Sequence, residues 1–374
     1  MRRLMRVIAC SIFCTLFLSC IILLPRLDSF SHNNPIRQGD DILLNQSISS
    51  IKYLLEPKCD TSANLTIIIT SKSSNFGLRN AQRSAIPLII GVQERIFLLA
   101  LDPDVSNSSL IEESVKYGDI LLGDFYEDYH RLSYKNGMGL IWVANTCRSD
   151  KEKYILKMDD DIMVRVDRLQ KELPYIFEDA DDKYSLAGYV QDNNKPSRSR
   201  SSKWFTDYSD SVYPDFLAGW AYVTTQKTVQ LIASTIMSDK HFIFWIDDVW
   251  ITGILAHKHL GLKLKSLNRF FAEYRDYIDQ CCFTDMSLEC MYWIGPSDRS
   301  IRAIEAFGKQ CSTIKCSHES IVQKEPMKLR SCSEGACLRW SSPESSSNKM
   351  SCLSKYANPF QLPHSKGVGE VIPL

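Results

Sequence analysis

Short apolar runs alternate with stretches of helical pattern through the middle of the sequence, and this order restricts the fold more than any other feature. The runs that predict strands are Leu65–Thr70, Arg95–Leu101, Asp119–Leu122, Tyr154–Met158 and Tyr184–Val190. The stretches that predict helices are 77–86, 109–118, 134–147 and 166–177. Because strands that alternate with helices pair mostly in parallel, this order predicts a doubly wound α/β fold whose sheet carries helices on both faces.

The N-terminus predicts the compartment. Three arginines precede "VIACSIFCTLFLSCIILL", an uncharged run over residues 7–24. The run is long enough to cross a membrane, and the positive-inside rule keeps the basic end in the cytosol. We therefore predict a cytosolic tail over 1–6, a signal anchor over 7–24 and a polar stem over 25–60. The alternative is a cleaved signal peptide, for which Ser19 and Cys20 offer a weak cleavage site.

Cysteines and glycosylation sequons agree with a lumenal chain. Of 13 cysteines, three lie in the apolar run, which leaves 13 − 3 = 10 beyond it. An even number in an oxidising compartment predicts disulfides, although the sequence leaves their pairing open. A zinc site is disfavoured, because the closely spaced cysteines near the C-terminus lack nearby histidine pairs. Sequons at Asn45, Asn64 and Asn107 also predict a lumenal location.

Composition changes along the lumenal part. A main domain is predicted over 61–307, followed over 308–374 by a tail rich in cysteine and serine, with little periodicity. Lys+Arg and Asp+Glu each number 44, so the formal net charge is zero. No global field therefore favours nucleic acid as a partner.

Three carboxylates stand side by side at the end of a predicted strand. The stretch "YILKMDDDIMVRVD" places Asp159, Asp160 and Asp161 directly after an apolar run. Ligands of doubly wound sheets bind at the carboxyl ends of strands, where such a triplet would lie. Repulsion between adjacent acids is offset by a divalent cation, which prefers oxygen ligands. The alternative is a solvated acidic turn, but the apolar residues on both sides favour the metal site.

At this point the sequence resembles the β-1,3-glycosyltransferases, which include β-1,3-galactosyl- and β-1,3-N-acetylglucosaminyltransferases. The matching stretches, in chain order, are "EESVKYGDILLGDFYEDYHRLSYK", "KMDDDIMV", "KWFTDYSDSVYPDFLAGWAYVTT" and "WIDDVWITGILAHKHLGLK". The ordered set spans about half of the chain. Departures from the family pattern are Arg165 in place of asparagine, Ser84-Ala85 in place of Thr-Trp, and Trp220 in place of glycine.

The resemblance implies a GT-A-like, Rossmann-like catalytic domain that uses a UDP-sugar and Mn²⁺. It implies that Asp161 is the principal metal ligand and that Asp159 lies near the nucleotide sugar and the metal. Asp160 is assigned a supporting role, either in the metal shell or toward a sugar hydroxyl. A metal held by these carboxylates would stabilise the diphosphate leaving group, whose negative charge grows as the glycosidic bond breaks.

Inverting transfer also needs a base on the opposite side of the anomeric carbon. Asp247 and Asp248 are adjacent acids in the apolar stretch "FIFWIDDVWI", where burial and like charge raise a carboxyl pKa. The match to the family assigns the base to Asp248, with Asp247 as the neighbour that orients it. The alternative is a helix start, with Asp247 as its cap and Asp248 in the first turn, and the two interpretations are compatible.

Several further residues are candidates for donor and acceptor contacts. Arg79 and Arg83 are four apart and share a helix face, so they are predicted to meet phosphate or uracil, the alternative being an exposed basic stripe. Lys135 is predicted to bind the donor on the same logic. Three residues are predicted to line the acceptor or sugar pocket: Trp220, Gly219 and Trp245.

The leading hypothesis is a single-pass type II Golgi membrane enzyme. It would transfer a sugar, most readily galactose, from a UDP donor to the 3-hydroxyl of a glycan on protein or lipid. A different class is a lumenal sugar-binding or chaperone-like protein on the same fold without turnover, which the departures from the pattern keep open. A metal phosphohydrolase is disfavoured, because no histidine-rich motif supplies a second metal cluster.

Overall fold

The computed structural model describes residues 47–178, 184–238, 242–279 and 292–313, with side chains as far as residue 308. It also describes the backbone of three short strands farther along the chain. The predicted cytosolic tail, the run over 7–24 and Asn45 lie outside these residues. Within the described parts, no helix has both the length and the apolar character needed to cross a membrane.

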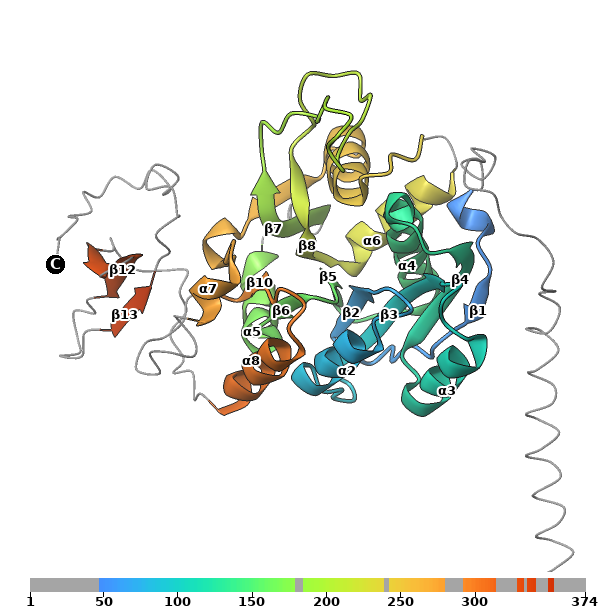
Figure 1. The fold of residues 1–374 in the computed structure, drawn as a ribbon, viewed down its shortest axis with the longest axis horizontal. Coiled ribbons are helices and arrows are strands. Elements are labelled where there is room, and N and C mark those ends of the chain that lie inside the picture. Colours follow the sequence, from blue (N-terminus) through green and yellow to red (C-terminus); the bar gives the residue numbers. More distant parts are fainter. Residues whose placement is uncertain are drawn as a thin grey trace, which may run out of the picture.

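An eight-stranded sheet runs through the domain in the order β1-β4-β3-β2-β5-β8-β7-β9 (Figure 1). Its strands are β1 (Tyr53–Leu55), β2 (Leu65–Thr70), β3 (Gln93–Leu101), β4 (Ile120–Tyr126), β5 (Tyr154–Asp159), β7 (Ser185–Gln191), β8 (Phe216–Thr225) and β9 (Lys263–Ser266). Four of its seven strand pairs are parallel and three are antiparallel. The five predicted strands all form, and the mixed, mostly parallel sheet is confirmed; β8, which pairs antiparallel with β5 and β7, was not predicted.

Helices cover both faces of the sheet, as the alternation predicts. The α-helices are α2 (Phe76–Ala85), α3 (Asn107–Tyr117), α4 (Leu132–Thr146), α5 (Val166–Ile176), α6 (Gln226–Met237), α7 (Arg275–Ile278) and α8 (Ile301–Thr313). A π-helix, η6 (Val249–His259), and three 3₁₀ turns, η3 (Ile48–Ser50), η4 (Tyr129–Arg131) and η7 (Asn268–Phe270), complete the set. The four predicted helices form at α2 to α5.

The alternation of side chains along β2 shows how the two cores form. Ile68 points into a core built with α4, α6 and η6, whereas Ile67 and Ile69 point into a second core built with α3 and α5. Because successive residues of a strand face opposite sides, a strand that is apolar throughout can serve both cores. All six residues of β2 are buried, so this strand lies at the centre of the domain.

A smaller unit holds the turn after β5 in place. β6 (Ile162–Val164) pairs antiparallel with β10 (Ile294–Pro296), and α8 packs beside α2 (Figure 1). Together they bury a third apolar cluster that contains Met163, Ile304 and Phe307.

Three more strands form an antiparallel backbone sheet: β11 (Lys328–Cys332), β12 (Gly335–Trp340) and β13 (Lys349–Cys352).

Two predicted domain boundaries are wrong. The stem was predicted to reach residue 60, but Ile48 and Ile51 are buried in the first core and β1 pairs with β4. The folded domain therefore begins by residue 47, because this segment completes an edge of the sheet. At the other end, the boundary at 307 falls inside α8, whose buried Phe307 anchors the helix against α2.

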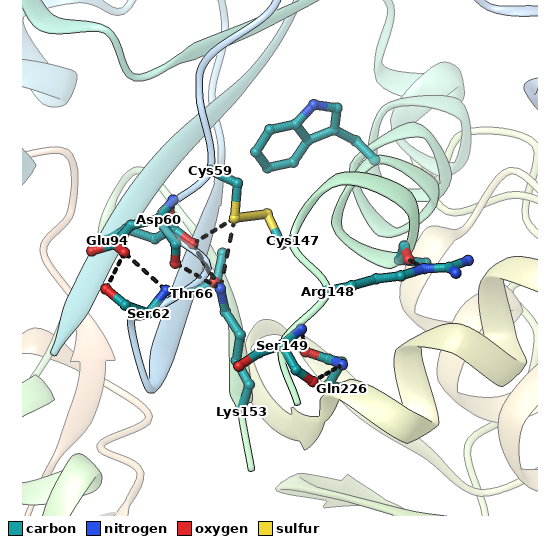
Figure 2. Close-up of a disulfide and its surroundings, with 12 residues drawn as sticks. Cys59, Asp60, Ser62, Thr66, Glu94, Cys147, Arg148, Ser149, Lys153 and Gln226 are labelled. Carbon is teal, nitrogen blue, oxygen red and sulfur yellow. Dashed lines mark hydrogen bonds and ion pairs between the residues drawn. A yellow bond between two sulfur atoms is a disulfide. The ribbon is translucent and has the colours of Figure 1, made fainter. Parts of the chain in front are cut away.

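A disulfide fastens the N-terminal segment to the end of α4. Figure 2 shows Cys59 bonded to Cys147, with Lys153 and Glu94 beside the bond. The Lys153 Nζ lies 3.1 Å from Glu94 Oε1 and donates to the Asp60 carbonyl at 3.0 Å. The two cysteines are 88 residues apart in sequence, and closing a loop of that length stabilises the fold by about 4–5 kcal/mol.

Candidate active site

The predicted acidic residues gather at the carboxyl ends of the central strands. β2 and β5 run in parallel with Thr70 opposite Asp159, so the triplet follows directly from the end of β5. Asp247 and Asp248 come from the start of η6, which packs against β8. We call these five aspartates, 159 to 161 with 247 and 248, the acidic cluster.

Lys157 joins the two parts of the acidic cluster. Its Nζ donates to Asp159 Oδ1 at 2.8 Å and to the Gly219 carbonyl at 2.5 Å, and it lies 3.9 Å from Asp247 Oδ2. Its side chain is only 2% exposed. Burial opposes its charge, yet the carboxylates of Asp159 and Asp247 outweigh that effect and raise the pKa of Lys157. The lysine therefore stays charged and holds one aspartate from each part.

Asp159 and Asp161 are the members of the triplet that remain open to solvent, each with a side chain 35% exposed. Burial, reinforced by the charge of Asp247, raises the pKa of Asp159 to about 7 against the pull of Lys157. Burial and the neighbouring Asp160 also raise the pKa of Asp161. Both carboxyl groups are therefore harder to ionise than a free aspartate.

Asp160 points the other way and is part of the scaffold. It is 5% exposed, and its Oδ2 accepts from Ser71 Oγ at 2.7 Å and from Asn75 Nδ2 at 2.9 Å. The Gln82 side chain donates to its carbonyl at 2.9 Å. The predicted contact of Asp160 with a sugar hydroxyl is therefore not supported, because its carboxylate already binds the loop after β2.

Asp248, the predicted base, is held by two backbone amides. Its Oδ2 accepts from the Gly219 amide at 3.1 Å and its Oδ1 from the Val249 amide at 2.8 Å. Burial and the charge of Asp247 raise the pKa of Asp248 to about 7, although these two amides oppose the shift. A carboxyl group with such a pKa can exchange a proton near neutral pH. Asp248 also caps η6, so the capping alternative holds with Asp248, rather than Asp247, as the cap.

Asp247 is fixed by a hydrogen bond from α4. Asn136 Nδ2 donates to its Oδ2 at 2.5 Å, and the Asn136 Oδ1 accepts from Thr70 Oγ1 at 2.6 Å. These two hydrogen bonds connect the end of β2 through α4 to the start of η6. Tyr222, opposite Lys157 on β8, is 3% exposed, and its hydroxyl has no hydrogen-bond partner among the described residues.

A π-helix shapes this corner of the site. Its backbone bonds span five residues instead of four, a geometry that is rare and frequent at functional sites. The Thr252 Oγ1 donates to the Asp248 carbonyl at 2.6 Å and accepts from the Leu217 amide at 2.9 Å. Gly219 gives Asp248 room, since a Cβ there would lie 3.3 Å from the Asp248 Cβ.

Aromatic side chains from three segments meet beside Asp247 and Asp248, and we call them the aromatic group. Its members are Tyr129, His130, Trp204 and Trp245. The Trp204 and Trp245 rings are stacked at 6.3 Å with 16° between their planes. Tyr129 and Trp204 are 42% and 43% exposed, so the group presents open ring faces to solvent.

Trp220 lies elsewhere. It packs against the second core, which contains Phe270, Phe271 and Trp293, and it is partly buried there. Its side chain therefore belongs to the opposite face of β8 from the one that meets Asp248 through Gly219 and Lys157. The structure does not join Trp220 to the aromatic group as the sequence interpretation expected for the pocket.

The predicted donor contacts of Arg79 and Arg83 are not supported. Arg79 is fully buried and pairs with Glu113, its Nε at 2.8 Å and its NH2 at 2.7 Å from the two carboxylate oxygens. Arg83 binds Asp119 through two hydrogen bonds of 2.9 and 2.7 Å, and Arg95 meets the same carboxylate. We call these five residues the arginine network. Their guanidinium groups are occupied inside the protein rather than facing a ligand.

Lys135 is likewise committed to the interior. Its side chain is 2% exposed, and its Nζ donates to both Glu127 oxygens, at 2.6 and 2.7 Å, and to the Ser71 carbonyl at 2.8 Å. Burial lowers its pKa, although Glu127 opposes the shift. With three acceptors already bound, Lys135 positions the loop after β2 and has no N–H left for a donor diphosphate.

Sequence reasoning missed three polar residues of this site. Lys157 is two positions before Asp159 on the same strand, so strand periodicity alone puts both side chains on one face. Asn136 and Arg299 carry no such local signal, because their partners lie far away in sequence.

The carboxylate oxygens of the acidic cluster suit a divalent cation. Asp159 and Asp161 offer carboxylate oxygens at the solvent-exposed edge, and Mn²⁺ and Mg²⁺ prefer oxygen ligands. The surplus negative charge, together with the raised pKa of both carboxyls, gives a cation a favourable place. The residues therefore fit the predicted metal.

Comparisons with known proteins agree on the family. The family model described as Galactosyltransferase matches residues 80–268. The chain is 33% identical over 224 residues to beta-1,3-galactosyltransferase 1 of Mus musculus and of Homo sapiens, covering 57% of this chain and 66% of each relative. It is 29% identical over 219 residues to beta-1,3-galactosyltransferase 2 of Homo sapiens, covering 55% and 50%. The match thus spans just under two thirds of the length of the first relatives.

Solved structures overlap only loosely. Galactosyltransferase LgtC, in complex with donor and acceptor sugar analogs, gives a TM-score of 0.36 at 10% identity and covers 68% of this chain and 98% of that chain. Mouse xyloside xylosyltransferase 1 in its apo form gives 0.29 at 9% identity, covering 63% and 97%. On the family match and its curated relatives, the chain belongs to the β-1,3-galactosyltransferase family.

Proposed function

We propose that the protein is an inverting, metal-dependent glycosyltransferase on a GT-A-like fold. It would move galactose from UDP-galactose to the 3-hydroxyl of a glycan on protein or lipid in the Golgi lumen. One observation carries the proposal. Asp159 and Asp161 lie at the same edge of the sheet as Asp247 and Asp248, in different surroundings, and Lys157 joins Asp159 to Asp247. Asp159 and Asp161 suit a cation, and Asp248 suits a base.

The roles of the residues follow from their surroundings. Asp161 and Asp159 would hold Mn²⁺, which when bound supplies Lewis-acid stabilisation of the diphosphate leaving group. Asp248 would take the proton of the acceptor hydroxyl, since its pKa of about 7 keeps much of it ionised at neutral pH. Asp247, fixed by Asn136, would keep the pKa of Asp248 high. Gly219 would hold Asp248 through its amide and Lys157 through its carbonyl.

The acceptor side is proposed at the aromatic group. Trp245 lies two residues before Asp247, and Tyr129 and Trp204 expose ring faces beside it. Aromatic rings stack on the apolar faces of sugar rings, so this group would hold the acceptor within reach of Asp248.

A lumenal location is supported by two features. The Cys59–Cys147 disulfide suits an oxidising compartment. Asn64 and Asn107, each within a sequon, are exposed and so accessible to glycosylation. With the apolar run over 7–24, these features favour a type II anchor in the Golgi membrane.

The test is turnover by the full-length chain purified in detergent. UDP-galactose, UDP-N-acetylglucosamine and UDP-N-acetylgalactosamine would be supplied with Mn²⁺ or EDTA and with a panel of glycan acceptors. We expect acceptor-dependent UDP release from UDP-galactose that EDTA abolishes. Asp161→Asn should lose it, whereas Asp150→Asn, an exposed aspartate outside the site, should keep it. Binding of UDP with Mn²⁺ but no turnover would favour the sugar-binding alternative instead.

A further inference from the structure

The loop between β10 and α8 lies directly against the acidic turn. The Asp161 carbonyl accepts from the Ser297 amide at 2.9 Å and from the Ser297 hydroxyl at 2.6 Å. β10 pairs with β6, the strand that follows the turn, and places Pro296 opposite Ile162. The backbone of this loop is therefore fixed to the backbone of the predicted metal ligand.

Two residues of the loop have an unfavourable backbone. Asp298 and Arg299 have φ angles of 51° and 60°, the left-handed region that residues with a side chain seldom adopt. Each such residue costs about 1–3 kcal/mol and persists only where its surroundings hold it. Here Ser297 holds one side, and Ser300 begins α8 on the other by accepting from the Ala303 amide at 3.3 Å.

This backbone directs the Arg299 guanidinium over the triplet. Its NH1 lies 3.8 Å from Asp161 Oδ2, and its NH2 donates to Asn75 Oδ1 at 2.9 Å. Asn75 in turn donates to Asp160. The Arg299 side chain is 59% exposed, in contrast to the buried arginines of the arginine network. It therefore keeps N–H groups for a ligand at the edge of the acidic cluster.

Stability does not account for this arrangement. An exposed ion pair contributes at most about 1 kcal/mol. The two left-handed residues cost more than that. Strained backbone retained beside an acidic turn is typical of ligand-binding positions.

We propose that Arg299 is a diphosphate-binding residue that pairs with Asp161 until a metal and a nucleotide arrive. The inference rests on the proposed function. Without metal, the guanidinium offsets part of the charge of Asp161. With a cation on Asp161, Arg299 turns to the phosphate oxygens, which its planar fork of donors matches.

Two binding measurements on the Arg299→Ala variant should move in opposite directions. Mn²⁺ alone should bind two- to five-fold more tightly, because a competing positive charge is gone. UDP at saturating Mn²⁺ should bind about ten-fold more weakly, because a charge-assisted contact is lost. Titration calorimetry and the electron paramagnetic resonance signal of free Mn²⁺, both on the full-length chain in detergent, measure the two constants. Neither readout depends on turnover.

The controls separate charge from geometry. Arg302→Ala removes an exposed arginine of α8 three positions away and should change neither constant. Arg299→Lys keeps the positive charge but not the planar arrangement of guanidinium N–H groups, so Mn²⁺ should bind as in the wild type and UDP should bind with intermediate affinity. Thermal melting of each variant checks that it folds.

The outcomes are distinct. Opposite shifts in Arg299→Ala, absent from Arg302→Ala, support the inference. If the wild type binds Mn²⁺ and UDP and the Arg299→Ala variant binds UDP equally well, the inference is wrong. The proposed function is not affected by that result. A wild-type chain that binds neither Mn²⁺ nor UDP overturns both.

Discussion

The arginine network and the acidic cluster are two groups of charged residues on neighbouring elements, the first buried and the second partly open to solvent, and their charges are balanced differently. In the arginine network three guanidinium groups meet two carboxylates, and the ion pairs are 2.7–3.2 Å long. In the acidic cluster five carboxylates meet one buried lysine and one exposed arginine. In the first group every guanidinium is paired inside the protein, whereas in the second burial, reinforced by the charge of Asp247, raises the pKa of Asp159 and Asp248.

The difference distinguishes residues that position the site from residues that could bind a ligand. Arg79 also donates to the Lys72 carbonyl at 2.7 Å and to the Ser73 carbonyl at 2.9 Å, which fixes the loop after β2. Ser71 in that loop binds Asp160. The arginine network thus positions the acidic cluster without reaching a ligand, and the acidic cluster keeps the unbalanced charge that a cation would offset.

The largest expected effect is on turnover when Asp248, the proposed base, is replaced. Asp248→Asn keeps the size of the side chain but cannot take a proton and can accept only one of the two amide hydrogen bonds, so kcat/KM should fall by about 10²–10⁴-fold. Affinity for UDP with Mn²⁺ should stay within about two-fold, because Asp159 and Asp161 remain. Initial rates and titration calorimetry on the same preparation measure both. Retained turnover would show that the raised pKa of Asp248 serves no catalytic purpose.

Glu113→Gln should produce the next largest effect, on stability. The substitution leaves Arg79 and Arg83 facing a neutral group in the interior, which costs about 3–5 kcal/mol of unfolding free energy. Chemical denaturation measures the change. The exposed Asp210–Lys258 pair is the control, since Asp210→Asn should leave the denaturation midpoint in place. Equal effects of the two substitutions would show that the arginine network contributes no more to stability than an exposed ion pair.

Stability of the metal-free chain should depend on pH in a predictable direction. The pKa of Asp159 and of Asp248 is about 7 in the folded state and near 3.8 in the unfolded chain. Between these values the folded state binds protons that the unfolded state does not, so stability rises as pH falls. Tm should increase by about 2–4 °C for each of the two groups from pH 8 to pH 6. A decrease over that interval would contradict an unbalanced acidic cluster, and Asp248→Asn should flatten the slope.

Gly219→Ala should give the smallest effect. The added Cβ would lie 3.3–3.4 Å from Asp248, close enough to displace the carboxylate by a few tenths of an ångström. We expect kcat to fall about ten-fold, because small displacements of a catalytic group are costly, with little change in Tm. Steady-state rates and melting curves test this. A change in Tm without a change in kcat would assign Gly219 to the scaffold alone.

Local pattern predicted the sheet well and the charged side chains poorly. The β-branched run of β2 and the strands like it are buried, and burial is what the pattern encodes. β8 was missed because alanine and glycine interrupt the aromatic and β-branched residues of "FLAGWAYVTT", so its run of strand-forming residues is broken. The acidic residues were found because they are adjacent in sequence and match a family pattern.

Arginine and lysine roles depend on partners that a local pattern does not contain. A spacing of four puts Arg79 and Arg83 on one helix face, but does not say that Glu113 and Asp119 cover that face. Arg299 could not be found for the same reason, since the loop that carries it meets the triplet across a sequence separation of 136 residues, from Ser297 to Asp161. Tertiary contacts decide which cation is committed to the interior and which stays open to a ligand.

The Cys59–Cys147 crosslink has a practical consequence for anyone producing this protein. Expression in a reducing host cytosol would leave both thiols unpaired beside the buried Lys153 and Glu94, and the chain would forfeit the loop-closure contribution. Secretion through an oxidising route would retain it. A bacterial cytosolic preparation without turnover would therefore reflect the missing crosslink and would not by itself test the proposed function.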